Sequence, residues 1–165
     1  SLRCLDVICF SQLVSKDGSI KHGGDEREGD EKGDDEKIHF DLAKVSQAVC
    51  YIGLVINSYS GQKLYNVKGV ACHLFDSTTF NDICRFSITG LQSCNQTALV
   101  VCAMYRTSGH DWYFRAINEP AGGQTAHENV DELQLFVRDS KMCENKMNDP
   151  SDLLLSIFNA FDKDK

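Results

Sequence analysis

The residues with the clearest chemical potential are the carboxylates of one short acidic segment, residues 25–36. This segment carries eight acidic and two basic side chains, a net charge of −6 against −7 for the whole chain. Carboxylate and carbonyl oxygens are the ligands that Ca²⁺ prefers, and crowded carboxylates repel one another until a cation neutralises them. Gly24, Gly29 and Gly33 would let the backbone fold around an ion. The segment therefore predicts a calcium site, with a solvated acidic loop as the alternative.

The spacing of these acids differs from that of an EF-hand loop. An EF-hand needs oxygen ligands at alternate positions, Gly at the sixth and Glu at the twelfth. Counting from Asp25 places Arg27 third and Gly29 fifth, and counting from Asp30 places Lys32 third. A calcium site in this segment must therefore use another order of ligands.

The elements that must position this segment are mostly short strands. Apolar, β-branched and aromatic residues gather in stretches bounded by Gly, Asn, Asp or Ser, which is typical of strands. Many such stretches without intervening helical periodicity predict a mainly β protein, an antiparallel β-sandwich. A helix is predicted over residues 129–138, where apolar residues recur at helical spacing. The predicted strands cover residues 5–10, 37–42, 51–58, 70–76, 83–88, 98–106 and 112–118.

The order of residues around the acidic segment closely resembles the TerD domain. The resemblance rests on Gly24-Asp25, on Gly29-Asp30, and on the run Gly33-Asp34-Asp35-Glu36 ahead of a strand that ends in Asp41-Leu42. It extends from residue 5 to about residue 138. It implies a β-sandwich of the TerD type that binds calcium, with a role in tellurium resistance or stress response through a protein partner. No catalytic residues come with it.

The resemblance also implies a ligand set. Asp6 matches an acidic family position upstream of the segment, and Glu26 replaces an Asn while keeping a side-chain oxygen. Cys4 stands where the family has a further Asp, and a thiol is a poor calcium ligand, so we expect one metal position to be weakened. The implied metal ligands are Asp6, Asp25, Glu26, Asp30, Asp34, Asp35 and Glu36.

The C-terminal part of the chain predicts a separate element. We expect residues 1–139 to form the TerD-like domain and the polar residues 140–148 to form a linker. Residues 149–165 predict an amphipathic helix that resembles the entering helix of an EF-hand. Asp162 and Asp164 would be the first ligands of its loop, but the sequence stops before the others. The chain also lacks an initial Met and the family's first strands, so we expect it to be a piece of a longer protein.

Composition narrows the classes of function. The net charge of −7 argues against a nucleic-acid partner, and no apolar stretch is long enough to span a membrane. The eight cysteines include no C-x-x-C pair, so we expect buried thiols in a reducing, cytoplasmic compartment. No local motif sets a nucleophile beside a base, which predicts a protein that is not an enzyme. Two alternatives remain: a metal-dependent hydrolase that uses the acidic segment, and a metal-free acidic scaffold for basic partners.

Three weaker features have ordinary structural interpretations. Gly122-Gly123-Gln124-Thr125 is interpreted as a turn entering the helix, with an anion site at the helix N-terminus as the alternative. His39 and His73 fall in predicted strands and are interpreted as structural. Three arginines in predicted strands are interpreted as part of a solvated sheet face; they are Arg85, Arg106 and Arg115.

Overall fold

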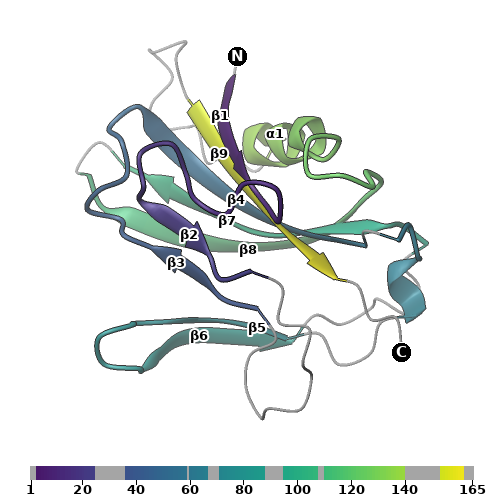
Figure 1. Ribbon diagram of the computed structural model, residues 1–165, viewed down its shortest axis with the longest axis horizontal. Coiled ribbons are helices and arrows are strands. Elements are labelled where there is room, and N and C mark those ends of the chain that lie inside the picture. The colour runs from purple at the N-terminus through teal and green to yellow at the C-terminus, as the bar shows by residue number, and fades with distance from the viewer. Residues whose placement is uncertain are drawn as a thin grey trace.

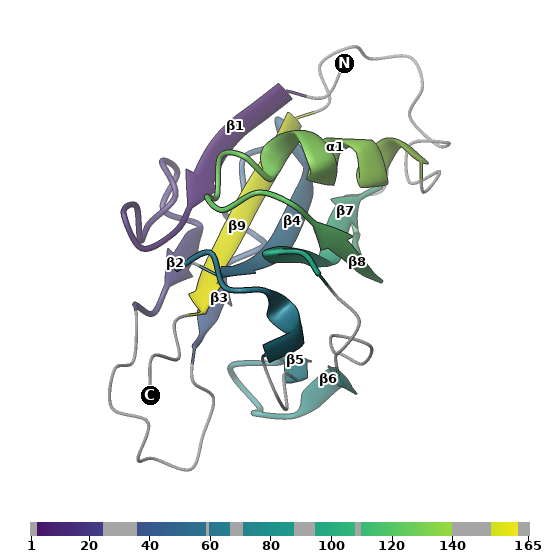
Figure 2. The same cartoon turned by 90° about the vertical axis from the view of Figure 1, so that its right-hand side faces the viewer.

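The architecture comes from a computed structural model, which describes residues 3–24, 36–58, 60–66, 71–87, 95–107, 110–139 and 153–161. In this part of the chain the fold is mainly β, with a single α-helix and one 3₁₀ turn (Figures 1 and 2). The strands are β1 (Arg3–Ile8), β2 (Ile20–His22), β3 (Ile38–Phe40), β4 (Val49–Ser58), β5 (Ala71–Phe75), β6 (Asp82–Ser87), β7 (Ala98–Arg106), β8 (Trp112–Ala121) and β9 (Leu153–Phe161). The helix is α1 (Val130–Asp139), and the 3₁₀ turn covers Leu64–Asn66.

Five strands form the main sheet, in the order β1-β9-β4-β7-β8. Strands β4, β7 and β8 are antiparallel neighbours, whereas β9 runs parallel to both β1 and β4. Two short antiparallel pairs, β2–β3 and β5–β6, make separate sheets. The prediction of a mainly β fold with antiparallel strands and a helix near its C-terminal end is therefore confirmed.

Both faces of the main sheet are covered. Figure 1 shows α1 over one face, and the β2–β3 and β5–β6 pairs on the opposite side. Side chains alternate across a strand, so Tyr51 and Val55 of β4 join Leu133 of α1 in one apolar cluster. On the other face, Ile52 of β4 packs in a cluster with Ile20 of β2. This double burial explains why β4 reads as an almost unbroken apolar run.

Helix α1 approaches the sheet closely because β4 has a glycine beneath it. The helix carries Asp131 and Glu132 in its first turn and Arg138 in its last, which suits the helix dipole. Its buried side chain Leu133 lies directly over Gly53, and a Cβ atom at that position would overlap it. Gly53 therefore sets the distance between α1 and the main sheet.

The prediction of a C-terminal helix is wrong in the described part of the segment. Residues 153–161 form β9, a strand inside the main sheet (Figure 1). The sequence there is an apolar run, Leu-Leu-Leu-Ser-Ile-Phe-Asn-Ala-Phe, and a run of this length fits a buried strand as well as a helix face. Pairing with β1 and β4 decides between them. The proposed linker and the proposed EF-hand ligands, Asp162 and Asp164, lie outside the described residues.

Other differences concern the ends of elements. Strand β1 ends at Ile8 rather than at residue 10, because Cys9 turns back to form a bridge with Gln12. Strand β2 has only three residues and was not predicted. Within the described residues, no helix is both long enough and apolar enough to cross a membrane.

The close contact between α1 and β4 makes a testable prediction. We expect Gly53→Ala to lower the free energy of unfolding by about 1–3 kcal/mol, because the added methyl group must displace Leu133. Thermal and urea unfolding would measure the change. Gly122→Ala is the matched control, because its Cβ would meet Glu132 only at an ordinary 3.5 Å. Equal stability of the two variants would contradict the packing described here.

Candidate functional site

The acidic segment connects two paired strands. Strand β2 pairs with β3 in antiparallel register, with His22 opposite Ile38. Beyond the last pair, the amide of Gly23 donates to the carbonyl of Lys37 at 2.8 Å. Gly24 then adopts a φ of +91°, a conformation that favours glycine. Both ends of the acidic segment are thus held side by side, and residues 25–35 close the loop between them.

A buried histidine and a buried carboxylate meet at the base of this loop. The amide of Gly24 donates to Nδ1 of His22 at 3.0 Å, so the ring proton resides on Nε2. That Nε2 lies 3.6 Å from Oε2 of Glu36. The two side chains are only 3% and 11% exposed. His22 and the last acidic residue of the segment thus lie side by side at the base of the loop.

Glu36 is the one predicted ligand of the acidic segment that the structure describes. Within the described ranges, no group of three or more His, Cys, Asp or Glu side chains is arranged to hold a metal ion. The prediction of a calcium site thus depends on side chains whose positions are not described. Five predicted ligands lie outside the described residues: Asp25, Glu26, Asp30, Asp34 and Asp35.

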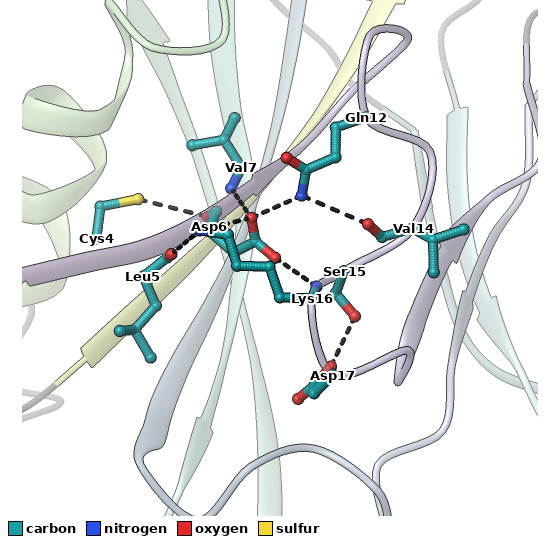
Figure 3. Close-up of polar contacts among 9 residues, drawn as sticks. All are labelled: Cys4, Leu5, Asp6, Val7, Gln12, Val14, Ser15, Lys16 and Asp17. Atoms are coloured by element: carbon teal, nitrogen blue, oxygen red, sulfur yellow. Dashed lines mark hydrogen bonds and ion pairs between the residues drawn. The ribbon is translucent and has the colours of Figure 1, made fainter.

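Asp6, the predicted ligand on β1, has a structural role (Figure 3). The carboxylate is buried and accepts hydrogen bonds from the amide of Val7 at 3.1 Å, from Nε2 of Gln12 at 2.6 Å and from the amide of Lys16 at 2.8 Å. Nζ of Lys16 lies 3.6 Å away. These contacts tie residues 12–16 to β1, and no acidic residue is among them. That Asp6 also binds a metal stays a prediction.

Asp17 organises the turn that leads into β2, a role that was not predicted from the sequence. Its Oδ1 accepts from the hydroxyls of Ser15 and Ser19 at 2.7 and 2.6 Å and from the amide of Ser19 at 3.0 Å. Its Oδ2 accepts from the amide of Ser46 at 3.0 Å, far along the chain. Desolvation works to raise the pKa of Asp17, but these hydrogen bonds outweigh it and hold the pKa well below its usual range.

An open pocket of about 390 Å³ lies beside Asp6. It is bordered by β1, by the segment after β1 and by the start of α1, and its lining mixes both signs of charge: Asp6, Lys16, His127 and Asp131. Because the Asp6 carboxylate already accepts three hydrogen bonds, it is poorly placed to act as a general base.

Two of the described cysteines, Cys72 and Cys102, have a raised pKa and are therefore thiols rather than reactive thiolates. Burial raises the pKa of Cys72 to about 11. Burial, together with the nearby thiols of Cys72 and Cys84, raises the pKa of Cys102 further. A raised pKa keeps a thiol protonated and inert at neutral pH. The six described cysteines present as thiols are Cys4, Cys9, Cys50, Cys72, Cys84 and Cys102.

The glycine-rich turn before α1 is a helix-entry turn, as interpreted. The amides of residues 122–124 donate to side chains that follow them: to Glu132 at 3.0 Å, to Asn129 at 2.9 Å and to Glu128 at 2.9 Å, respectively. Asn129 is fully buried, and a Cβ on Gly123 would overlap its amide. Because side chains already take up these three donors, the turn has no open anion site.

The interpretation of Arg106 as part of a solvated sheet face is wrong. This side chain is 6% exposed. It donates to the carbonyl of Val45 at 3.0 Å and to Oε1 of Gln47 at 3.1 Å. Its guanidinium also lies 4.6 Å from the ring centre of Trp112, a cation–π contact. Arg106 thereby fastens the segment before β4 to the main sheet.

His73 belongs to a charged group on the outer β5–β6 pair. Its Nδ1 lies 2.7 Å from Asp82, and Nε of Arg85 donates to the other oxygen of Asp82 at 2.9 Å. Hydrogen bonds from His73 and then from Arg85 lower the pKa of Asp82. The group links the two strands across their register, which fits a structural role for His73.

Part of this sequence is similar to known proteins. Residues 3–127 match the TerD domain family. The chain is 30% identical over 123 residues to the tellurium resistance protein TerZ of Serratia marcescens, covering 74% of this chain and 62% of that protein. It is 32% identical over 126 residues to the uncharacterized protein YceE of Bacillus subtilis, and the match covers 74% of this chain and 65% of that protein. It is 29% identical over 118 residues to the stress response protein SCP2 of the same bacterium, and the match covers 69% of this chain and 58% of that protein. The chain thus spans less than two thirds of the length of these relatives.

The Asp17 hydrogen bonds predict a pH dependence. Since the folded-state pKa is lowered, the stabilisation from this carboxylate is present above its unfolded pKa, near 4, and is lost as the pH falls below that value toward the lower folded-state pKa. We expect Asp17→Asn to destabilise the protein at pH 7, and the difference from the parent to shrink on acidification. Urea unfolding between pH 7 and pH 2.5 would measure it.

Asp111→Asn is the matched control for this experiment, because Asp111 is an exposed carboxylate in the turn between β7 and β8. It should change stability little at pH 7. A stability difference for Asp17→Asn that stays constant over the whole pH range would contradict the role assigned to its charged form.

Proposed function

Because the chain belongs to the TerD domain family, we propose that it is a calcium-binding domain that acts in a stress response through a protein partner. The names of its relatives, which refer to tellurium resistance and to stress response, support the setting. Thiols at all six described cysteines are compatible with a reducing, cytoplasmic environment.

One observation carries the calcium part of the proposal. Pairing of β2 with β3 forces both ends of the acidic segment together, with the Gly23–Lys37 hydrogen bond at the base. Eight carboxylates are thereby confined to a closed loop with only two bases among them. Confined like charges repel by about 1 kcal/mol per pair at 4 Å even in water, and by more near a protein surface. A divalent cation would convert that repulsion into binding free energy.

The chemistry of the available donors suits a hard cation. All the acidic side chains of the segment offer oxygen, and the backbone of a glycine-containing loop can add carbonyl oxygens. We propose that Asp25, Glu26, Asp30, Asp34 and Asp35 supply ligands together with Glu36. His22 lies 3.6 Å from Glu36, and its imidazole is a ligand for transition metals rather than for calcium. The loop length and charge favour Ca²⁺ over the smaller, more rigid Mg²⁺ shell.

Calcium binding would have two consequences for the domain. It would stabilise the folded state by RT ln(1 + [L]/Kd), about 2.7 kcal/mol at a hundredfold excess over Kd. Each bound ion would also reduce the net negative charge of the segment, −6 without metal, by two. The surface around the β2–β3 pair would then present a different potential to a partner, which is how we propose that the ion regulates binding.

The two alternatives make different demands. A metal-dependent hydrolase needs an open coordination position and a general base within reach of bound water. Asp6, one of the described carboxylates that line the pocket, is engaged in hydrogen bonds. A metal-free acidic scaffold would bind basic partners with strong salt dependence and no response to calcium. Calcium calorimetry separates the metal-free scaffold from the two interpretations that include a bound metal.

The test is a titration of calcium into the metal-free chain by calorimetry. We expect binding in the micromolar range and a rise in melting temperature. Asp34→Ala/Asp35→Ala should abolish both, because it removes two of the proposed ligands. Asp111→Ala/Glu119→Ala is the matched control: it removes the same charge at exposed positions around β8 and should bind as the parent does.

Three outcomes would argue against the proposal. Absence of heat together with an unchanged melting temperature would leave a solvated acidic loop. Equal weakening by both double variants would indicate a diffuse ion atmosphere rather than a site. Magnesium binding as tight as calcium binding would exclude a calcium-selective loop.

A further inference from the structure

The last strand of the sequence lies inside the main sheet rather than at its edge. Figure 1 shows β9, in yellow, between β1, in purple, and β4, in blue. Nine residues of β9 pair with β4, from Leu153 opposite Val49 to Phe161 opposite Ser58. Five residues pair with β1, from Leu153 opposite Arg3 to Ile157 opposite Ile8. In the described part of the chain, β1 reaches the main sheet through β9.

The position of β9 is a slot between two strands, β1 and β4, and both present backbone hydrogen-bonding groups to it. Its walls are backbone edges of β1 and β4, and the adjoining side chains Ile8, Ile52 and Val55 are 0%, 0% and 1% exposed. An empty slot would leave two rows of buried backbone groups without ladder partners, which is costly. The sheet is therefore incomplete until a strand occupies this position.

Local structure does not commit residues 153–161 to their own slot. Thirteen residues, 140–152, separate β9 from α1 in the sequence. Parallel pairing needs a crossover rather than a hairpin, and the crossover from β1 to β9 spans almost the whole chain. The apolar pattern of the segment also fits a helix. Closing this long loop is a late and entropically expensive step of folding.

We propose that the slot between β1 and β4 is a strand-exchange site, and that residues 153–161 of a second copy of this chain can occupy it in place of the chain's own β9. An exchanged strand has the same sequence, so it makes the same pairs in the same register with β1 and β4. Exchange therefore loses no pairing and changes only the connection. The resulting dimer has two sheets, each completed by the partner's strand.

Competition with the chain's own strand sets the conditions for exchange. The chain's own strand is tethered to the rest of the chain through residues 140–152, and tethering gives it an effective concentration on the order of millimolar. Dilute, equilibrated protein is therefore monomeric. Refolding at high concentration favours exchange, because the slot stays open until the C-terminal strand arrives.

The register supplies a direct test through a natural thiol. Cys4 of β1 lies opposite Leu154 of β9, and neighbouring strands are about 4.8 Å apart, within the range that a disulfide can bridge. A chain carrying Cys4→Ser with Leu154→Cys is refolded together with ¹⁵N-labelled parent chain, at about 5 µM, far below the effective concentration of the tethered strand, and at about 1 mM, comparable to it. After mild oxidation, linked peptides are identified by mass spectrometry.

We expect a disulfide between the labelled and unlabelled chains through Cys4, rare at the low concentration and abundant at the high one. The single variant Leu154→Cys should cross-link within one chain when dilute. Leu155→Cys is the register control, since residue 155 lies opposite Asp6 rather than Cys4. Cross-links confined to single chains at both concentrations would overturn the exchange. Absence of any link to Cys4 would overturn the slot itself.

A second measurement covers the case in which the cysteine variants do not fold. Labelled and unlabelled parent chains, which need no substitution, are refolded together at the high concentration and analysed by native mass spectrometry. Mixed dimers that persist on dilution support the exchange, because separating them requires both strands to leave their slots. Monomers alone, or dimers that dissociate immediately on dilution, would overturn it.

Discussion

The structure depends on the complete pairing and double burial of one strand, β4. It bonds to β7 on one side and to β9 on the other, and its side chains enter separate apolar clusters on the two faces of the sheet. Helix α1 can lie close over it because Gly53 has no side chain. Each layer is thus positioned against β4, and backbone pairing buried on both faces is costly to break. This well-packed centre allows the chain to include the acidic segment, whose like charges repel one another.

The acidic segment is locally unfavourable. Its net charge of −6 resists closure of the loop, yet the β2–β3 pair that closes it is only three residues long on each side. The pair is supported from below, because Ile20 of β2 is fully buried in the cluster that contains Ile52. Burial of apolar side chains therefore offsets a local electrostatic cost. A cation would lower the same cost, which is the physical connection between the fold and the proposed calcium site.

Much of this arrangement could be predicted from the sequence, because periodicity reports burial. Helix α1 and most strands, including β7 and β8, lie where their patterns placed them. The apolar run at 153–161 was misassigned because its pattern fits both kinds of element and only long-range pairing decides between them. Arg106 was misassigned because the carbonyl of Val45 and the side chain of Gln47, which accept its hydrogen bonds, lie 61 and 59 residues away in the sequence. The candidate acidic ligands follow from composition and resemblance, but composition could not show that Asp6 serves the 12–16 segment.

These contacts form a continuous path from the C-terminal strand to the acidic segment. Strand β9 holds β1 in the sheet, and Asp6 on β1 holds residues 12–16 (Figure 3). Asp17 holds the next turn and ties it to Ser46, and that turn leads directly into β2, which closes the acidic loop with β3. The base of the loop thus depends on the strand that completes the sheet. Because coupling free energies are reciprocal, an ion that stabilises the closed loop would also stabilise this path, and with it the pairing of β1 with β9.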